Sequence, residues 1–90
     1  EQLFDQGNYQ ECIIECTKSV EAELRVRLGL FDEQLTLGML IQKGIEKGIE
    51  TLNEFRFVNI LNNRIEHENY RPKRQETEKA IDITTRILMS

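Results

Sequence analysis

The side chains best suited to chemistry gather near residue 67, where the only histidine of the chain stands. Histidine is the one side chain whose unperturbed pKa lies close to neutral pH, so it can accept or donate a proton. Asn63 and Arg64 precede His67 within one helical turn, and Arg64 shares a helix face with it. These three residues are the candidate catalytic group. A lone histidine is also commonly a structural hydrogen-bonding residue, and the sequence leaves both roles open.

A basic cluster follows the histidine. Arg71, Lys73 and Arg74 are candidates for contact with phosphate groups or RNA, because lysine and arginine neutralise phosphates. Such runs also occur simply to keep a protein surface soluble. The formal net charge of the chain is −4, so the molecule as a whole does not attract nucleic acid or an anionic membrane.

Two cysteines, Cys12 and Cys16, lie four residues apart on what we expect to be an apolar helix face. Within a regular helix this spacing does not readily form a disulfide. A zinc site would need two further ligands, which a lone His67 cannot supply. We therefore interpret both thiols as small buried hydrophobic groups in a reducing compartment, and we expect no metal and no cofactor.

Two other patterns also predict structure rather than chemistry. The glycines between Gly38 and Gly48 lack the Gly-Lys-Ser/Thr ending of a phosphate loop. The carboxylates of Glu46 and Glu50 lie one helical turn apart with lysines nearby, which is typical of a solvated helix face.

The elements that position these residues are predicted to be helices. Asn8 and Glu11 have the spacing of a capping box, in which each residue bonds the other's backbone N–H. Apolar residues then recur every three or four positions up to Gly29, which predicts a helix over about 9–28. The piece Gln2–Gln6 is expected to form a preceding helical turn or two.

Three further helices are expected, over about 36–43, 49–67 and 73–89, with Thr36 as the cap of the first of them. A turn around Pro72, the only proline, separates the last two. No stretch alternates apolar and polar residues as a strand does. We predict an all-α fold, an antiparallel helical bundle of four to five helices.

Length and composition favour a single domain over residues 1–90. The chain has 90 residues, no Pro/Gly/Ser-rich linker, 39% hydrophobic and 31% charged residues, as globular domains do. No apolar run is long enough for a membrane span and no signal peptide is evident, so we expect a cytoplasmic protein. Because the chain begins with Glu rather than Met, we expect it to be an excised part of a longer protein. A domain this small buries only about 60–65% of its unfolded surface, which favours a homodimer or a larger protein partner.

Several short motifs follow one another over nearly the whole chain: Leu3-Phe4, Gly7-Asn8-Tyr9, Glu15, Val20-Glu21, Leu24-Arg25, Leu28, Thr36-Leu37-Gly38, Leu40-Ile41, Leu61 to His67, Tyr70-Arg71-Pro72 and Glu78 to Ile81. Their order resembles that of a HEPN domain. The resemblance implies a helical bundle that dimerises. It also implies a metal-independent endoribonuclease of toxin–antitoxin, phage-defence or RNA-processing systems, as many HEPN domains are.

The sequence departs from the family at its active pattern, an arginine followed by a histidine after four to six residues. Counting back from His67, the arginine would fall at Ile60, Leu61 or Asn62, and none of these is arginine. Cleavage of RNA by its own 2′-hydroxyl needs a proton acceptor and a cation beside the phosphorane. Neutral Asn62 does not supply that charge, and Arg64 is separated from His67 by only two residues.

Three hypotheses follow. In the first, the chain is a degenerate, RNA- or nucleotide-associated HEPN-like dimerisation module in which Asn63 and His67 are interface hydrogen-bonding residues. In the second, it is an endoribonuclease that uses His67, with Arg64 and Asn63 holding the phosphate. In the third, it is a structural adaptor attached to a separate catalytic domain.

Overall fold

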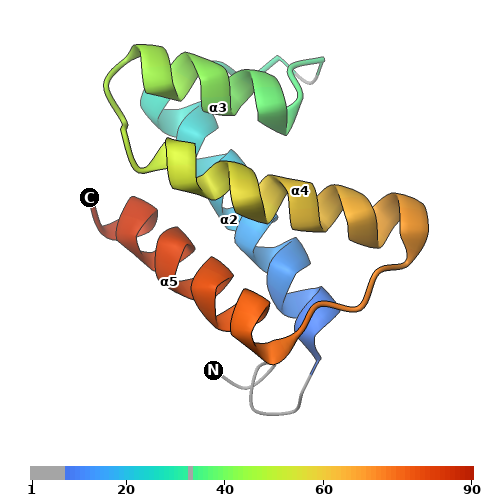
Figure 1. Cartoon of the computed structure of the whole chain (residues 1–90). Helices are drawn as coiled ribbons and strands as arrows, with labels where there is room; N and C mark the ends of the chain where they lie inside the picture. Colours follow the sequence, from blue (N-terminus) through green and yellow to red (C-terminus); the bar gives the residue numbers. More distant parts are fainter. Residues whose placement is uncertain (1–7, 33) are drawn as a thin grey trace.

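The computed structural model describes residues 8–32 and 34–90, which contain four helices and no strand (Figure 1). The helices are α2 (Tyr9–Leu28), α3 (Leu37–Glu46), α4 (Leu52–Glu68) and α5 (Arg74–Met89). The predicted all-α fold is confirmed. The piece Gln2–Gln6, for which a helical turn is predicted, lies outside the described residues.

Helix α2 begins and ends where its capping residues predict. The Asn8 side-chain oxygen accepts a hydrogen bond from the Glu11 N–H at 3.3 Å. The return bond from Glu11 to the Asn8 backbone, the other half of the predicted capping box, does not form. At the far end, Gly29 has a φ of 65°, which a residue without Cβ adopts at little cost. The predicted range of this helix is confirmed.

Helices α3 and α4 meet at a turn whose position differs from the prediction. The Thr36 hydroxyl caps α3 as expected, accepting from the Met39 N–H at 3.2 Å. The helix then continues to Glu46 rather than ending at residue 43. Gly44 is buried, and because it has no side chain, α3 can pack closely against Leu24 of α2 and Leu52 of α4. Gly48 turns the chain with a φ of 97°, so α4 begins at Leu52 rather than at residue 49.

The core lies where the apolar faces of all four helices meet. Cys16 belongs to it and Cys12 is likewise buried, as predicted from their place on the apolar face of α2. The other core side chains are Ile13, Val20 and Leu24 from α2, Leu40 and Ile41 from α3, Leu52, Phe55, Val58, Leu61 and Ile65 from α4, and Ala80, Ile83 and Ile87 from α5.

Helices joined by short connections run antiparallel. The α3–α4 pair is tied by a bond from the Arg56 guanidinium to Gln42 at 2.7 Å, and the α4–α5 pair by an ion pair between Arg86 and Glu54 at 2.8 Å. In each pair the start of one helix lies beside the end of the other (Figure 1).

The first and last of these helices, α2 and α5, run in the same direction (Figure 1). At their starts, the Gln10 side chain donates to the Tyr70 carbonyl at 2.8 Å. At their ends, the Arg27 guanidinium donates to the Ile87 carbonyl at 3.0 Å. This arrangement arises because the connection between α2 and α3 leads the chain back along α2, so that α3 starts beside the middle of α2.

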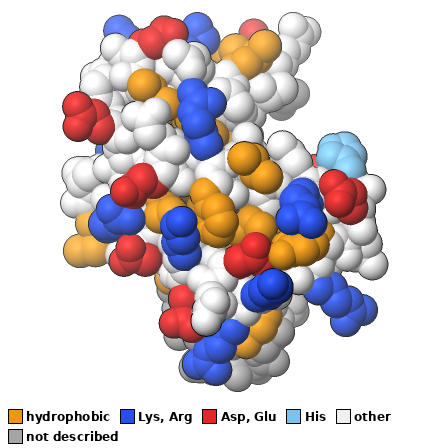
Figure 2. All heavy atoms as spheres, in the orientation of Figure 1, with side chains coloured by type: hydrophobic (Ala, Val, Ile, Leu, Met, Phe, Trp, Pro, Cys, Tyr) orange, Lys and Arg blue, Asp and Glu red, His pale blue; other side chains and the backbone are white. Residues whose placement is uncertain are grey.

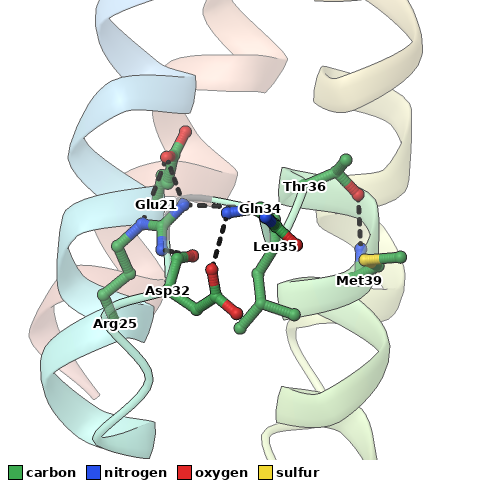
Figure 3. Close-up of polar contacts among 7 residues, drawn as sticks. All are labelled: Glu21, Arg25, Asp32, Gln34, Leu35, Thr36 and Met39. Carbon is green, nitrogen blue, oxygen red and sulfur yellow. Dashed lines mark hydrogen bonds and ion pairs between the residues drawn. The ribbon is translucent and has the colours of Figure 1, made fainter.

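Arg25 holds that returning connection in place (Figure 3). Its guanidinium donates to the backbone carbonyls of Asp32 and Leu35, at 2.7 and 2.9 Å. On its other edge it forms an ion pair with Glu21 at 3.0 Å. The fixed fork of a guanidinium can donate to all three acceptors at once, so a single side chain holds the connection that brings α3 against α2.

Replacing Arg25 with alanine is expected to lower the free energy of unfolding by about 1–3 kcal/mol, because two hydrogen bonds from a charged donor are lost, an exposed one to the Asp32 carbonyl and a half-buried one to the Leu35 carbonyl. Arg25→Lys should recover less than half of this loss, since an ammonium group cannot reach all three acceptors. Urea denaturation followed by circular dichroism measures both variants. Arg56→Ala, which removes a single exposed bond, is the control and should change stability by less than about 0.5 kcal/mol.

Candidate functional site

His67 lies in the last turn of α4 with its side chain exposed. No hydrogen bond or ion pair joins it to another residue of the described ranges. The structure places the imidazole at the tip of the helix, as the sequence predicts, where it is free to meet a partner molecule. It is not held by an orienting group, which a general base normally has.

Arg64 is engaged with its own neighbours. Its guanidinium stacks on the ring of Tyr70, 3.8 Å from the ring centre, and pairs with the Glu68 carboxylate at 3.8 Å. Asn63 borders a cavity between α4, α2 and α3. The three candidate catalytic residues lie at the same end of α4. The charge of Arg64, however, is already engaged in the cation–π contact with Tyr70 and the ion pair with Glu68.

The basic cluster lies along the turn before α5 and in the first residues of that helix. Arg71, Lys73 and Arg74 are all exposed, and Arg74 forms an ion pair with Glu78 at 3.3 Å. Figure 2 shows Lys and Arg side chains interspersed with Asp and Glu side chains over the visible face of the molecule. The surface seen there carries charges of both signs and no broad field of one sign.

Beside this cluster, Tyr70 and Glu76 form a hydrogen-bonded pair that the sequence analysis does not predict. The Tyr70 hydroxyl donates to the Glu76 carboxylate at 2.7 Å, and the Lys73 N–H donates to the same oxygen at 2.9 Å. Partial desolvation raises the pKa of Glu76, but these two hydrogen bonds and the positive charges of Lys73 and Arg64 together outweigh it, and the pKa lies below its usual value. The bond to Glu76 and burial raise the pKa of Tyr70. The pair fixes the turn before α5.

This pair should make stability depend on pH. The lowered pKa means that the folded state favours the Glu76 carboxylate, so its contribution is present above the usual glutamate pKa of about 4.3 and is lost as the pH falls toward the lower folded value. We expect the difference in unfolding free energy between wild type and Glu76→Gln to shrink over that window. Urea denaturation at several pH values below 7 measures it. Glu78→Gln, which removes only an exposed ion pair, should show no such trend.

A polar cavity of about 500 Å³ lies between α4, the middle of α2 and the start of α3. Helix α4 lines it with three asparagines and a glutamate, and we call it the asparagine cavity after Asn59, Asn62, Asn63 and Glu66. These residues recur every three or four positions, so they share one helix face. Opposite them lie Lys18 and Glu21 of α2 and Gly38 at the start of α3.

The asparagines of this cavity differ from the other asparagines of the described ranges. Asn8, Asn53 and Asn69 each hydrogen-bond through the side chain to a nearby segment. No bond to another described residue involves the carboxamides of Asn59 and Asn63. The Asn62 side chain is only partly hydrogen-bonded. It is 8% exposed and donates to Glu66 at 2.8 Å, but its buried oxygen has no hydrogen-bond partner within the described chain.

The three asparagines of the cavity lower the stability of α4. Asparagine is a poor helix former, and three of them in mid-helix cost roughly 2 kcal/mol relative to alanine. A buried carbonyl oxygen without a partner adds a desolvation penalty of its own. The carboxamides of Asn59 and Asn63 form no hydrogen bond within the described residues that would offset their cost, which is the pattern expected when side chains are kept for binding.

Sequence reasoning missed this cavity as a site, although it considered Asn63 as a candidate and Asn62 as the place of a missing arginine. The signal that was available is three asparagines within five residues of a predicted helix. The sides of the cavity formed by α2 and α3 depend on the connection between these helices, which Arg25 holds in place. Three asparagines in one helix do not predict that arrangement.

Comparisons with family models, with curated proteins and with solved structures found no match. The resemblance to HEPN domains therefore rests only on the motifs quoted above. None of the described helices is both long and apolar enough to cross a membrane.

Proposed function

We propose that this chain is a non-catalytic, HEPN-like helical module that works by self-association. The observation that carries the proposal is a group of large apolar side chains left in water. Val26 and Phe31, in the last turn of α2 and just after it, are each 68% exposed. Leu88 and Met89, in the last turn of α5, are exposed as well.

These four side chains, the terminal apolar group, lie toward the same end of the bundle. The ends of α2 and α5 are joined by the bond from Arg27 to the Ile87 carbonyl. Exposed apolar surface of large side chains is typical of interaction sites, and at this end of the bundle both α2 and α5 contribute such side chains. Small domains also gain needed stability from a partner, because their cores bury only part of their apolar surface.

Catalysis is not part of the proposal. The guanidinium that would stabilise a phosphorane is absent at Asn62, and Arg64 is stacked on Tyr70. Stabilising donors of this kind are worth roughly 10²–10³ in rate. If the module also meets RNA, the exposed side chains of Arg71, Lys73 and Arg74 are those that would contact its phosphates.

The double variant Val26→Ser/Phe31→Ser is expected to weaken dimerisation about 100-fold or more. Two exposed apolar side chains that become buried at an interface contribute roughly 3 kcal/mol together. Light scattering over a range of protein concentrations measures the dissociation constant of the dimer. The matched control is Ile60→Ser, on the outer face of α4, where the isoleucine is 58% exposed but lies away from the ends of α2 and α5.

A strict monomer at high micromolar concentration would contradict the proposal. So would a dimer that Ile60→Ser dissociates and the double variant does not, because the interface would then lie on α4. Cleavage of unstructured RNA in EDTA that His67→Ala abolishes would instead support the endoribonuclease hypothesis.

A further inference from the structure

From the asparagine cavity we infer that the chain binds the main chain of an extended, basic peptide segment of another protein. The site lies between α4, α2 and the start of α3, whereas the terminal apolar group lies at the ends of α2 and α5. The inference therefore goes beyond the proposed self-association and does not depend on it.

The spacing of the polar side chains along α4 suits a peptide main chain. Asn59, Asn63 and Glu66 follow one another at intervals of four and three residues, which places them about 4.5–6 Å apart along the helix. An extended chain presents groups on the same side every 6.6–6.8 Å or so, a comparable interval that flexible side chains can match. A carboxamide offers both a donor and an acceptor, which are the two functions that a peptide unit requires.

Donors and acceptors are both available in the cavity. The Glu66 carboxylate that binds the Asn62 amide is an acceptor, and the carboxamide oxygens of Asn59 and Asn63, which line the same cavity, are two more. Across the cavity, the N–H groups of Leu37 and Gly38, the first two of α3, are donors that no carbonyl within the helix accepts, whereas the Met39 N–H is already bonded to the Thr36 hydroxyl. A phosphate or a carboxylate offers acceptors only and would leave the acceptors on α4 unused. A peptide, with alternating N–H and C=O groups, can satisfy both sides.

The charges and the open wall favour a basic peptide. Of the charged side chains in the lining, Glu21 is paired with Arg25 at 3.0 Å and Lys18 lies 3.8 Å from the Glu15 carboxylate, whereas Glu66 has no cationic partner among the described residues. A lysine or arginine of the peptide would complement Glu66. At Gly38 a Cβ would meet nothing closer than 3.9 Å, so this wall leaves room for another backbone to approach.

A random heptapeptide library displayed on phage, selected on the folded wild-type chain, supplies the probe. We expect enrichment of peptides that contain lysine or arginine and few acidic residues. Synthetic versions of the enriched peptides are then tested by fluorescence anisotropy. Asn59→Ala/Asn63→Ala should weaken their binding about tenfold or more, as expected for two or more lost hydrogen bonds. Asn53→Ala, on the same helix but outside the cavity, should leave the affinity unchanged.

Two further measurements separate binding from folding. Alanine is the better helix former, so the double variant should unfold at the same or a higher urea concentration than wild type. Its dimerisation by light scattering should equal that of wild type. N-methylation of the peptide backbone should weaken binding, because it removes main-chain donors. The inference is wrong if no enriched peptide depends on Asn59 and Asn63, if acidic peptides are enriched, or if N-methylation has no effect.

Discussion

Replacing Phe55 with alanine should lower the free energy of unfolding by about 3–5 kcal/mol, which is the usual cost of removing a buried phenyl ring. Phe55 lies in α4 and is 0% exposed. Because domains of this kind have a total stability of about 5–15 kcal/mol, the variant should be only marginally folded. Urea denaturation followed by circular dichroism measures the loss.

Phe57→Ala, on the same helix, is the matched control. Phe57 is only half-buried, with the Lys79 ammonium 4.5 Å from its ring centre, so its replacement should cost clearly less. Equal losses for the two variants would show that the core is not centred on Phe55.

Gly44→Val is the second substitution with a large expected effect, a loss of about 2–3 kcal/mol from overpacking. A Cβ at Gly44 would overlap the Leu52 Cδ1 atom and approach the Leu24 Cδ2 atom to 3.4 Å. Both leucines are fully buried, so neither can move into solvent. Thermal and urea denaturation measure the loss.

Gly38→Val is the matched control in the same helix, because Gly38 is exposed and a Cβ there makes only ordinary contacts. It should change stability by less than about 0.5 kcal/mol. If both glycine variants were equally stable, α3 would not pack against α2 and α4 as closely as described.

Local signals predicted α2 well. Its range follows from the Asn8 cap, the spacing of apolar residues and Gly29, all of which act within a few residues of the helix ends. The end of α3 was predicted too early because a glycine inside a helix is unfavourable on its own. At Gly44 the close approach of Leu24 and Leu52 outweighs that cost, and such a contact depends on residues far away in the sequence.

The candidate site also combines features that nearby residues determine with features that depend on residues far away in the sequence. That His67 lies at a helix end could be predicted from periodicity, and so could its position near Arg64. The stacking of Arg64 on Tyr70 could not, because it depends on how the turn before α5 folds back. The asparagine cavity needs three helices, and its α3 wall is placed by Arg25 through bonds to the carbonyls of Asp32 and Leu35.

The shared direction of α2 and α5 has a mechanical consequence. The start of α2 lies near Tyr70 and the end of α5 lies near Arg27, so these two points are at opposite ends of the helix pair. A force that pulls them apart would load the interface in shear, along its whole length at once. In an antiparallel pair the same two points would be neighbours, and the helices would peel apart one turn at a time.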